Sequence, residues 1–328
     1  MTKEAVRRVG LQFDDNQLVP ALFGEHDCNL SQIEEELDIE ILSKGNEVVI
    51  VGEKEKLKAA QIVFDILWDR LSNNMDVTNN EVSSAVQIAL SPMDHNTRNL
   101  AMNALKESHV KVKSKKKTLT ARTPNQAAYL KAIDDNNLIF GIGPAGTGKT
   151  FLAVAKAVEM IQNGDVDRII LCRPAVEAGE SLGFLPGTMQ EKVDPYLRPI
   201  YDALHDMMDP EQIAKRLADG TIEIAPLAFM RGRTLSNAFV VLDEAQNTTP
   251  TQMKMILTRI GENSRMVITG DITQTDLPKT IKSGLLDAKE VLEGIKGTAF
   301  VNFLEADVVR SRIVKEIVNA YDKRDRNK

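Results

Sequence analysis

From residue 120 onward, the chain alternates between short apolar runs and polar segments, and four of these runs predict buried β-strands. They are LIFGIG at 138–143, RIILC at 168–172, FVVL at 239–242 and MVIT at 266–269. FLAVAKAVEMI at 151–161 has the spacing of a helix and follows the first run at once. Continuous apolar strands combined with helices are typical of a parallel sheet in an α/β domain.

The N-terminal part has a different pattern, which predicts a smaller α/β unit. Two segments have helical spacing, and the two between them resemble a hairpin around the turn Ser-Lys-Gly-Asn. In chain order, these four segments are 29–37, 39–42, 47–52 and 57–71. Asn29 and Ser31 are the residues suited to cap the first helix. The order helix, strand, strand, helix is that of a KH-like RNA-binding module.

A KH module clamps a nucleic-acid backbone with a Gly-x-x-Gly loop between two helices. The candidate loop here is Gly24-Glu25-His26-Asp27. It lacks the second glycine and carries two carboxylates, which repel phosphates. Two roles therefore stay open for this module: contact with RNA, or docking to a partner without RNA contact.

The charge of the chain limits the kinds of partner that it can bind. The 328 residues carry 41 Lys+Arg against 47 Asp+Glu, a net charge of −6, which argues against binding nucleic acid by bulk charge alone. Residues 111–117 are a local exception with five lysines in seven positions. They form either a solvated linker or a basic segment that binds RNA through its charge.

The length predicts two domains, and the mix of 43% hydrophobic and 27% charged residues excludes disorder throughout.

The cellular compartment is predicted from what the sequence lacks. No apolar stretch approaches 18 residues, and MTKEAVRRVG has no apolar signal-peptide core, so we expect a cytoplasmic protein without a membrane partner. Cys28 and Cys172 are then expected to be buried thiols rather than a disulfide. Two cysteines and four scattered histidines do not predict a zinc site.

The segment after the first strand matches the phosphate-binding pattern GxxxxGK[ST] in full. It lies between a predicted strand and a predicted helix, the context in which this pattern binds nucleotides. Backbone N–H groups of such a loop converge on phosphates, Lys149 would reach the β- and γ-phosphates, and the Thr150 hydroxyl would bind Mg²⁺. The predicted nucleotide-binding residues are Gly143, Pro144, Ala145, Gly146, Thr147, Gly148, Lys149 and Thr150.

Two acidic residues follow the strand at 239–242. This strand would deliver Asp243 to the carboxyl edge of the sheet, beside the phosphate loop, where a carboxylate can hold Mg²⁺ through water. Glu244 comes next and is placed to orient or deprotonate the water that attacks the γ-phosphate. An Asp-Glu pair is otherwise unfavourable at a strand end because like charges repel. The pair therefore predicts hydrolysis.

The strand at 266–269 runs into Gly270-Asp271-Ile-Thr-Gln274 at the same predicted edge. An amide can sense the γ-phosphate by hydrogen bonding without adding charge, which is the role we predict for Gln274. Asp271 is compatible with a simple turn role.

Together these blocks resemble the PhoH-like ATPases. The similarity covers roughly residues 120–320 and includes GPAGTGKT, VLDEAQN, TGDITQTDLP, RPAVEAGESLGFLPG at 173–187 and MRGRTL at 230–235. The N-terminal module resembles the KH-type portion of the longer bacterial members. The resemblance implies a RecA-like nucleotide-binding domain related to one half of superfamily 1 helicases, acting in ATP-dependent RNA metabolism. It also suggests partnership with a metal-dependent endoribonuclease of rRNA maturation.

The resemblance assigns Gln126 as a reader of the adenine base. An amide can satisfy both a donor and an acceptor on the adenine edge. The alternative is a surface glutamine on an opening helix. Arg173 and the glycine-rich segment after it correspond to a region that touches single-stranded nucleic acid in related helicases. Aromatic residues are only 5% of the chain, which argues against a platform that stacks many bases.

The number of residues after the phosphate loop shapes the expected mechanism. The 179 residues that follow Lys149 (328 − 149) suffice for one RecA-like core and not two. An arginine that completes the ATP site would then come from the chain's own tail or from a neighbouring subunit. A closed ring would supply it, and the family resemblance suggests a hexamer. Arg310 is the preferred donor, with Arg231 and Arg233 next; each is alternatively a surface charge or a member of a local ion pair.

We therefore predict an Mg²⁺-dependent ATPase that acts with RNA. The expected organisation is a KH-like module at 1–75, a helical and basic linker at 76–119 and a RecA-like ATPase domain at 120–328. The alternative function is a nucleotide-gated RNA-binding adaptor for a ribonuclease, with hydrolysis as a timer. A small-molecule or protein kinase is a weaker alternative, because the sequence offers no acceptor pocket or kinase catalytic loop.

Overall fold

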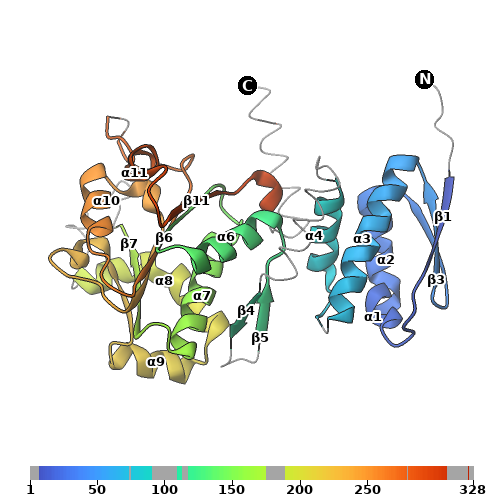
Figure 1. Ribbon diagram of the computed structural model, residues 1–328, viewed down its shortest axis with the longest axis horizontal. Coiled ribbons are helices and arrows are strands. Elements are labelled where there is room, and N and C mark those ends of the chain that lie inside the picture. Colours follow the sequence, from blue (N-terminus) through green and yellow to red (C-terminus); the bar gives the residue numbers. More distant parts are fainter. Residues whose placement is uncertain are drawn as a thin grey trace. The chain divides into compact units, whose positions relative to one another are not determined.

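The computed structural model describes residues 7–73, 75–90, 109–112, 117–174, 189–278, 280–308 and 324. The chain forms two units, Met1–Glu107 with Arg122–Pro124 and Ser108–Ala121 with Asn125–Lys328 (Figure 1).

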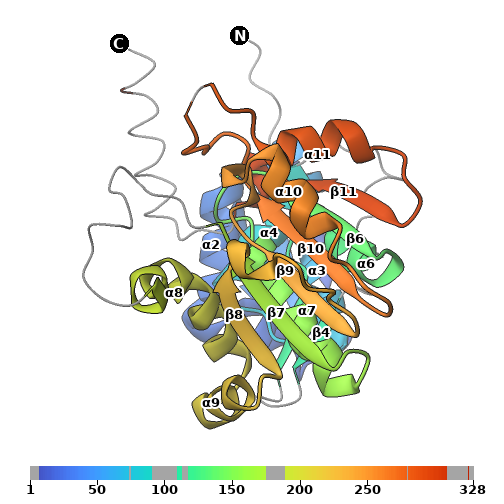
Figure 2. The ribbon, with the colours of Figure 1, turned by 90° about the vertical axis from the view of Figure 1, so that its left-hand side faces the viewer.

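The second unit is built on a parallel sheet with six described strands. Its spatial order is β11-β6-β10-β9-β7-β8, and every neighbouring pair is parallel (Figure 2). The strands are β6 (Leu138–Ile142), β7 (Arg168–Arg173), β8 (Ile222–Pro226), β9 (Ala238–Leu242), β10 (Arg265–Gly270) and β11 (Thr298–Asn302). The four apolar runs of the sequence are the four central strands, and the fold is the expected α/β arrangement of a RecA-like P-loop protein.

Helices cover this sheet. They are α6 (Pro124–Asp135), α7 (Lys149–Asn163), α8 (Met189–Met207), α9 (Pro210–Ala218), α10 (Pro250–Leu257) and α11 (Gly284–Leu292). Because strand side chains alternate between faces, Phe140, Ile170 and Val240 share one face, where they form a core with residues of α10 and α11. A short antiparallel hairpin, β4 (His109–Val112) and β5 (Lys117–Thr120), packs against α7.

The carboxyl ends of all six strands meet at one edge of the sheet. Backbone hydrogen bonds continue past the strands there: Gly143 N–H donates to the Gly270 carbonyl (3.1 Å), and Asp243 N–H donates to that of Cys172 (2.9 Å). The first bond joins the loop after β6 to the end of β10, and β9 lies beside β10 in the sheet. The three motifs that follow these strands therefore share one edge, as the sequence predicted.

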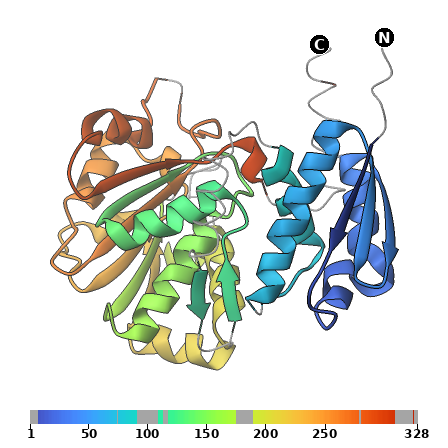
Figure 3. The same cartoon turned by 45° about the vertical axis from the view of Figure 1, so that its right-hand side comes forward.

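The first unit has a three-stranded antiparallel sheet of order β1-β3-β2, with helices on one face (Figure 3). Its elements are β1 (Arg7–Gln12), α1 (Val19–Phe23), η1 (Glu25–Asp27), α2 (Cys28–Leu37), β2 (Glu40–Lys44), β3 (Glu47–Gly52), α3 (Lys54–Ser72) and α4 (Asn79–Leu90). The predicted order helix, strand, strand, helix is confirmed as α2, β2, β3 and α3. β1 and α1 were not predicted.

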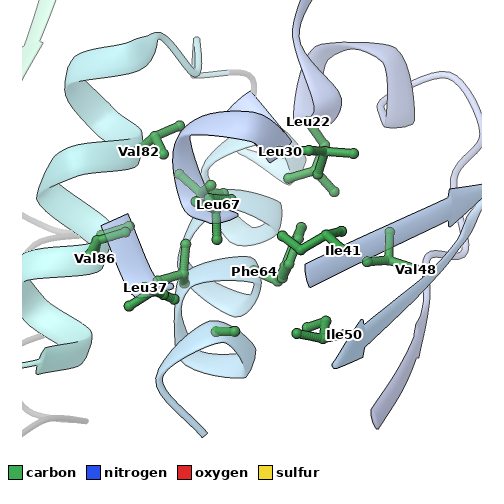
Figure 4. Close-up of a cluster of buried hydrophobic side chains, with 14 of the residues drawn as sticks. Leu22, Leu30, Leu37, Ile41, Val48, Ile50, Phe64, Leu67, Val82 and Val86 are labelled. Atoms are coloured by element: carbon green, nitrogen blue, oxygen red, sulfur yellow. The ribbon is translucent and has the colours of Figure 1, made fainter. Parts of the chain in front are cut away.

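Apolar side chains from the sheet and helices of this unit converge on one core, including Ile41, Val48, Phe64 and Leu67 (Figure 4). Helix α4 falls in the range expected to be linker. Its Val82 and Val86 belong to the same core, because α4 packs on α2 and α3.

The loop between α1 and α2 is the predicted Gly24-Glu25-His26-Asp27, but the capping expected after it is wrong. Helix α2 begins at Cys28, with Asp27 at the N-cap and no side-chain cap bond. Asn29 lies inside the helix, 1% exposed, and its Nδ2 donates to the carbonyls of Ala21 (3.3 Å) and Leu22 (3.1 Å). Asn29 thus ties α2 to the end of α1, and Ser31 is not the cap either.

Both cysteines are free thiols. Cys172 is buried in β7, and burial raises its pKa to about 12. Cys28 is exposed, so the expectation that it would be buried is wrong. No helix in the described part of the chain is long and apolar enough to span a membrane. Of the lysine-rich segment, residues 113–116 lie outside the described ranges.

Candidate functional site

The phosphate loop joins β6 to α7 with a backbone that only glycine adopts easily. Gly143, Gly146 and Gly148 have φ angles of 150°, 82° and 82°. A Cβ on Gly143 would lie 2.4 Å from the Phe303 carbonyl oxygen. Helix α7 starts directly after Gly148, so the first free N–H groups of the helix face the loop.

Lys149 is buried and folds its side chain back over this loop. Its Nζ donates to the carbonyls of Gly143 and Pro144, both at 2.7 Å, and to Thr147 Oγ1 at 3.3 Å. Burial lowers the pKa of Lys149, and the carboxylates of Asp271, Asp243 and Glu244 oppose that shift. The Lys149 ammonium is therefore held by the loop itself, and three nearby carboxylates act on its pKa.

Asp243, directly after β9, meets two hydroxyls from other elements. Its Oδ1 accepts hydrogen bonds from Thr150 Oγ1 at the start of α7 and from Thr269 Oγ1 in β10, both at 2.7 Å. A carboxylate and a threonine hydroxyl in contact supply the hard oxygen donors that Mg²⁺ prefers. The predicted pair Thr150 and Asp243 is brought together and fits this ion. Thr269 was not predicted, because only the pairing of β9 with β10 places it beside Asp243.

Glu244 follows in a left-handed backbone conformation, with φ 52° and ψ 39°. Such a conformation is unfavourable for residues other than glycine and often marks a functional position. Arg173, at the end of β7, forms an ion pair with Glu244 Oε1 at 2.7 Å. Gln246 Nε2 donates to Glu244 Oε2 at 2.5 Å. Both oxygens of the predicted water-positioning carboxylate are thus held by protein groups.

Gln246 also connects this carboxylate to the loop after β10. The side chain is 1% exposed; its Oε1 accepts from Asp271 N–H (3.0 Å), and its Nε2 also donates to the Gln274 carbonyl (3.2 Å). The Gln274 side chain itself is exposed. The sequence contained Gln246 within a motif, but no pattern indicated that it joins two motifs.

Gln126, on α6, lies against the phosphate loop. Its side chain is buried, and Nε2 donates to the Thr147 carbonyl at 3.0 Å. This contact rules out the alternative of a surface glutamine and leaves its role toward adenine as a prediction.

The candidate arginines differ in their surroundings. Arg233 forms two parallel bonds to Glu223, at 2.6 and 2.7 Å, which raise the pKa of the guanidinium. Arg231 is exposed, whereas Arg310 lies outside the described residues. The pairing of Arg233 with Glu223 makes Arg233 less suited than the exposed Arg231 to reach a neighbouring site.

Known proteins resemble this chain over most of its length. A family model described as PhoH-like protein matches residues 118–322. A PhoH-like protein of Bacillus subtilis (strain 168) is 47% identical over 304 residues, which cover 92% of this chain and 93% of the relative. One of Mycobacterium tuberculosis (strain H37Rv) is 49% identical, covering 93% of this chain and 85% of the relative.

Among solved structures, a crystal structure of Pif1 helicase from Candida albicans aligns with a TM-score of 0.30 and 12% identity. The alignment covers 60% of this chain and 42% of the helicase. A likeness this weak supports no conclusion about function.

Proposed function

Because the chain belongs to the PhoH-like family, we propose that it is an Mg²⁺-dependent ATPase whose hydrolysis is coupled to RNA. The observation that carries the proposal is the hydrogen-bonded group of Thr150, Asp243 and Thr269 beside the Lys149 loop. It joins the start of α7 to the ends of β9 and β10, the three elements that surround a bound triphosphate in P-loop proteins.

Binding would use the residues of the loop and of α6. Backbone N–H groups from Ala145 to Thr150 would hold the phosphates, and Lys149 would exchange its carbonyl contacts for phosphate oxygens. Gln126 would contact adenine. Thr150 and Asp243 would hold Mg²⁺, which neutralises charge on the phosphates when it is bound.

In the hydrolysis step, water attacks the γ-phosphorus and the bond from that phosphorus to the β–γ bridging oxygen breaks. Glu244 would receive the proton of the water, and Gln274 would sense the departing γ-phosphate. Glu244 first has to leave its contacts with Arg173 and Gln246, so the side chains that hold it control when it acts.

The ATPase proposal is tested with Lys149→Ala. The variant removes the charge that compensates the phosphates, and we expect phosphate release to fall by roughly 100-fold or more. Lys131→Ala on the exposed side of α6 is the matched control and should retain normal turnover. Full phosphate release by the Lys149 variant would refute the assignment.

RNA coupling is supported by the position of Arg173. Its guanidinium lies at the carboxyl edge of the sheet, 2.7 Å from the carboxylate proposed to activate water. RNA phosphate that attracts Arg173 would release Glu244, which links RNA binding to hydrolysis through one ion pair.

The alternative is an adaptor in which ATP occupancy switches the docking of a ribonuclease and hydrolysis acts as a timer. The paired state of Glu244 favours it, because a restrained carboxylate suits slow hydrolysis. Glu244→Gln separates the two functions. A timer without hydrolysis should stay in the ATP-bound state and keep stimulating its partner, whereas a motor should bind ATP and stall.

A further inference from the structure

Asp271 directly follows the end of β10, beside the start of the phosphate loop that leaves β6. The carbonyl of Gly270, just before it, accepts a hydrogen bond from Gly143 N–H at 3.1 Å. Asp271 also follows Thr269 by two positions, and strand geometry places such residues on the same face. Thr269 contacts Asp243 on that face. Asp271 therefore lies two positions after a residue that touches Asp243.

The two oxygens of the Asp271 carboxylate have different surroundings. Oδ1 accepts from Thr273 N–H (2.9 Å) and from Thr273 Oγ1 (2.6 Å), which forms a local turn. Oδ2 is buried, and no hydrogen-bond donor among the described residues reaches it. The side chain is 6% exposed. A buried charged oxygen without a donor is unfavourable, so it calls for a ligand or a function.

The turn does not account for an aspartate at this position. An asparagine would supply the same Oδ1 acceptor to Thr273 without a buried charge. The negative charge and Oδ2 are the features that need another explanation.

The electrostatic surroundings indicate what Oδ2 would bind. Among the carboxylates that raise the pKa of Lys149, Asp271 has the largest effect. Within the described residues, Lys149 nevertheless gives its hydrogen bonds to loop carbonyls and to Thr147, not to a carboxylate. In the described part of the chain, neither Asp243 nor Asp271 forms an ion pair. Phosphates would add negative charge at the same edge, and a divalent cation is the species that offsets both.

We propose that Asp271 is a third residue on the metal side of the site. With Thr150 and Asp243 it holds the divalent cation that accompanies the nucleotide, and Oδ2 acts through water. The inference rests on the proposed function, since it concerns the same nucleotide site. Asp271 is a positioning residue for the metal rather than a group that reacts.

Asp271→Asn provides the test, because it keeps the Oδ1 acceptor of the turn and removes the oxygen in question. Mn²⁺ affinity would be measured by electron paramagnetic resonance at saturating ADP, with ADP affinity measured separately in the presence of a chelator. We expect Mn²⁺ affinity to fall by about 10-fold, as is usual when an outer partner of a metal site is lost. Metal-free ADP affinity should stay the same or rise, because negative charge near the phosphates is removed.

Thr273→Val is the matched control, since it removes a turn contact to Oδ1 and leaves Oδ2 in place. It should retain Mn²⁺ affinity. Asp271→Ser is a second variant that also lacks Oδ2 and whose hydroxyl can still accept from Thr273 N–H. Thermal unfolding of each variant verifies folding.

The outcomes separate the two levels of inference. Unchanged Mn²⁺ affinity in a folded Asp271→Asn or Asp271→Ser variant overturns the metal role, as does an equal loss in Thr273→Val. If the unmodified chain binds neither ADP nor Mn²⁺ with ADP, the proposed function itself fails.

Discussion

The ion pair between Arg173 and Glu244 joins the two side chains through which we propose that RNA binding is coupled to ATP hydrolysis. Glu244 is proposed to activate water, yet both of its oxygens are held, one by Arg173 and one by Gln246. Its left-handed backbone shows that the fold imposes this position on the residue. A residue held in this way responds to whatever competes for its partners.

Arg173→Ala should therefore raise the ATPase rate measured without RNA and abolish stimulation by RNA. The rise should be roughly two- to five-fold, which corresponds to a partly exposed ion pair of about 1 kcal/mol. Arg168→Ala is the control, because Arg168 lies at the opposite end of the same strand and donates to the Ser236 carbonyl. A rate that falls while RNA still stimulates it would contradict the coupling scheme.

The sequence predicted the residues of the site better than their contacts. Lys149, Thr150 and Asp243 lie together as expected, since fixed spacing relative to a strand or helix end determines where they point. Gln126, which the family resemblance assigned, lies against the same loop. Thr269, Gln246 and the buried oxygen of Asp271 were missed as site groups. Their significance depends on strand pairing and on which atoms lack donors, and neither is encoded in a local pattern.

At the scale of elements, burial decided which strands could be recognised. The four central strands are covered on both faces and appear as uninterrupted apolar runs. The edge strands β8 and β11 are only partly buried, so their sequences IEIAP and TAFVN lack such a run. β1 was missed for the same reason: none of its residues is fully buried.

The contact between α1 and α2 leads to a prediction about stability. Asn29→Ala would leave the carbonyls of Ala21 and Leu22 without their buried donor, at a cost of about 1–3 kcal/mol. Ser31→Ala should have little effect, because Ser31 is exposed and is not the cap of α2. Urea unfolding followed by tryptophan fluorescence reports on this unit, since Trp68, the one tryptophan of the chain, packs against its core. Equal destabilisation by both variants would contradict the bridging role of Asn29.

At the scale of the whole molecule, the arginine predicted to complete the ATP site comes either from the same chain or from a neighbouring subunit. The described part of the second unit contains one parallel sheet, and Arg233 is already paired with Glu223. If Arg310 acts on a neighbouring subunit in a ring, the nucleotide site and the arginine of one active centre belong to different chains. Defects in the two should then complement each other.

Mixing Lys149→Ala subunits with Arg310→Ala subunits tests this arrangement. Each variant alone should be nearly inactive, because one lacks the lysine of the site and the other lacks the arginine given to its neighbour. After dissociation and random reassembly at equal amounts, about one quarter of the interfaces combine an intact site with an intact arginine, so about one quarter of the activity should return. If Arg310 served its own chain, no interface would combine the two, and the mixture would stay as inactive as its components. Repeating the mixing experiment with Arg231→Ala subunits in place of Arg310→Ala subunits asks whether the exposed arginine after β8 performs the role instead.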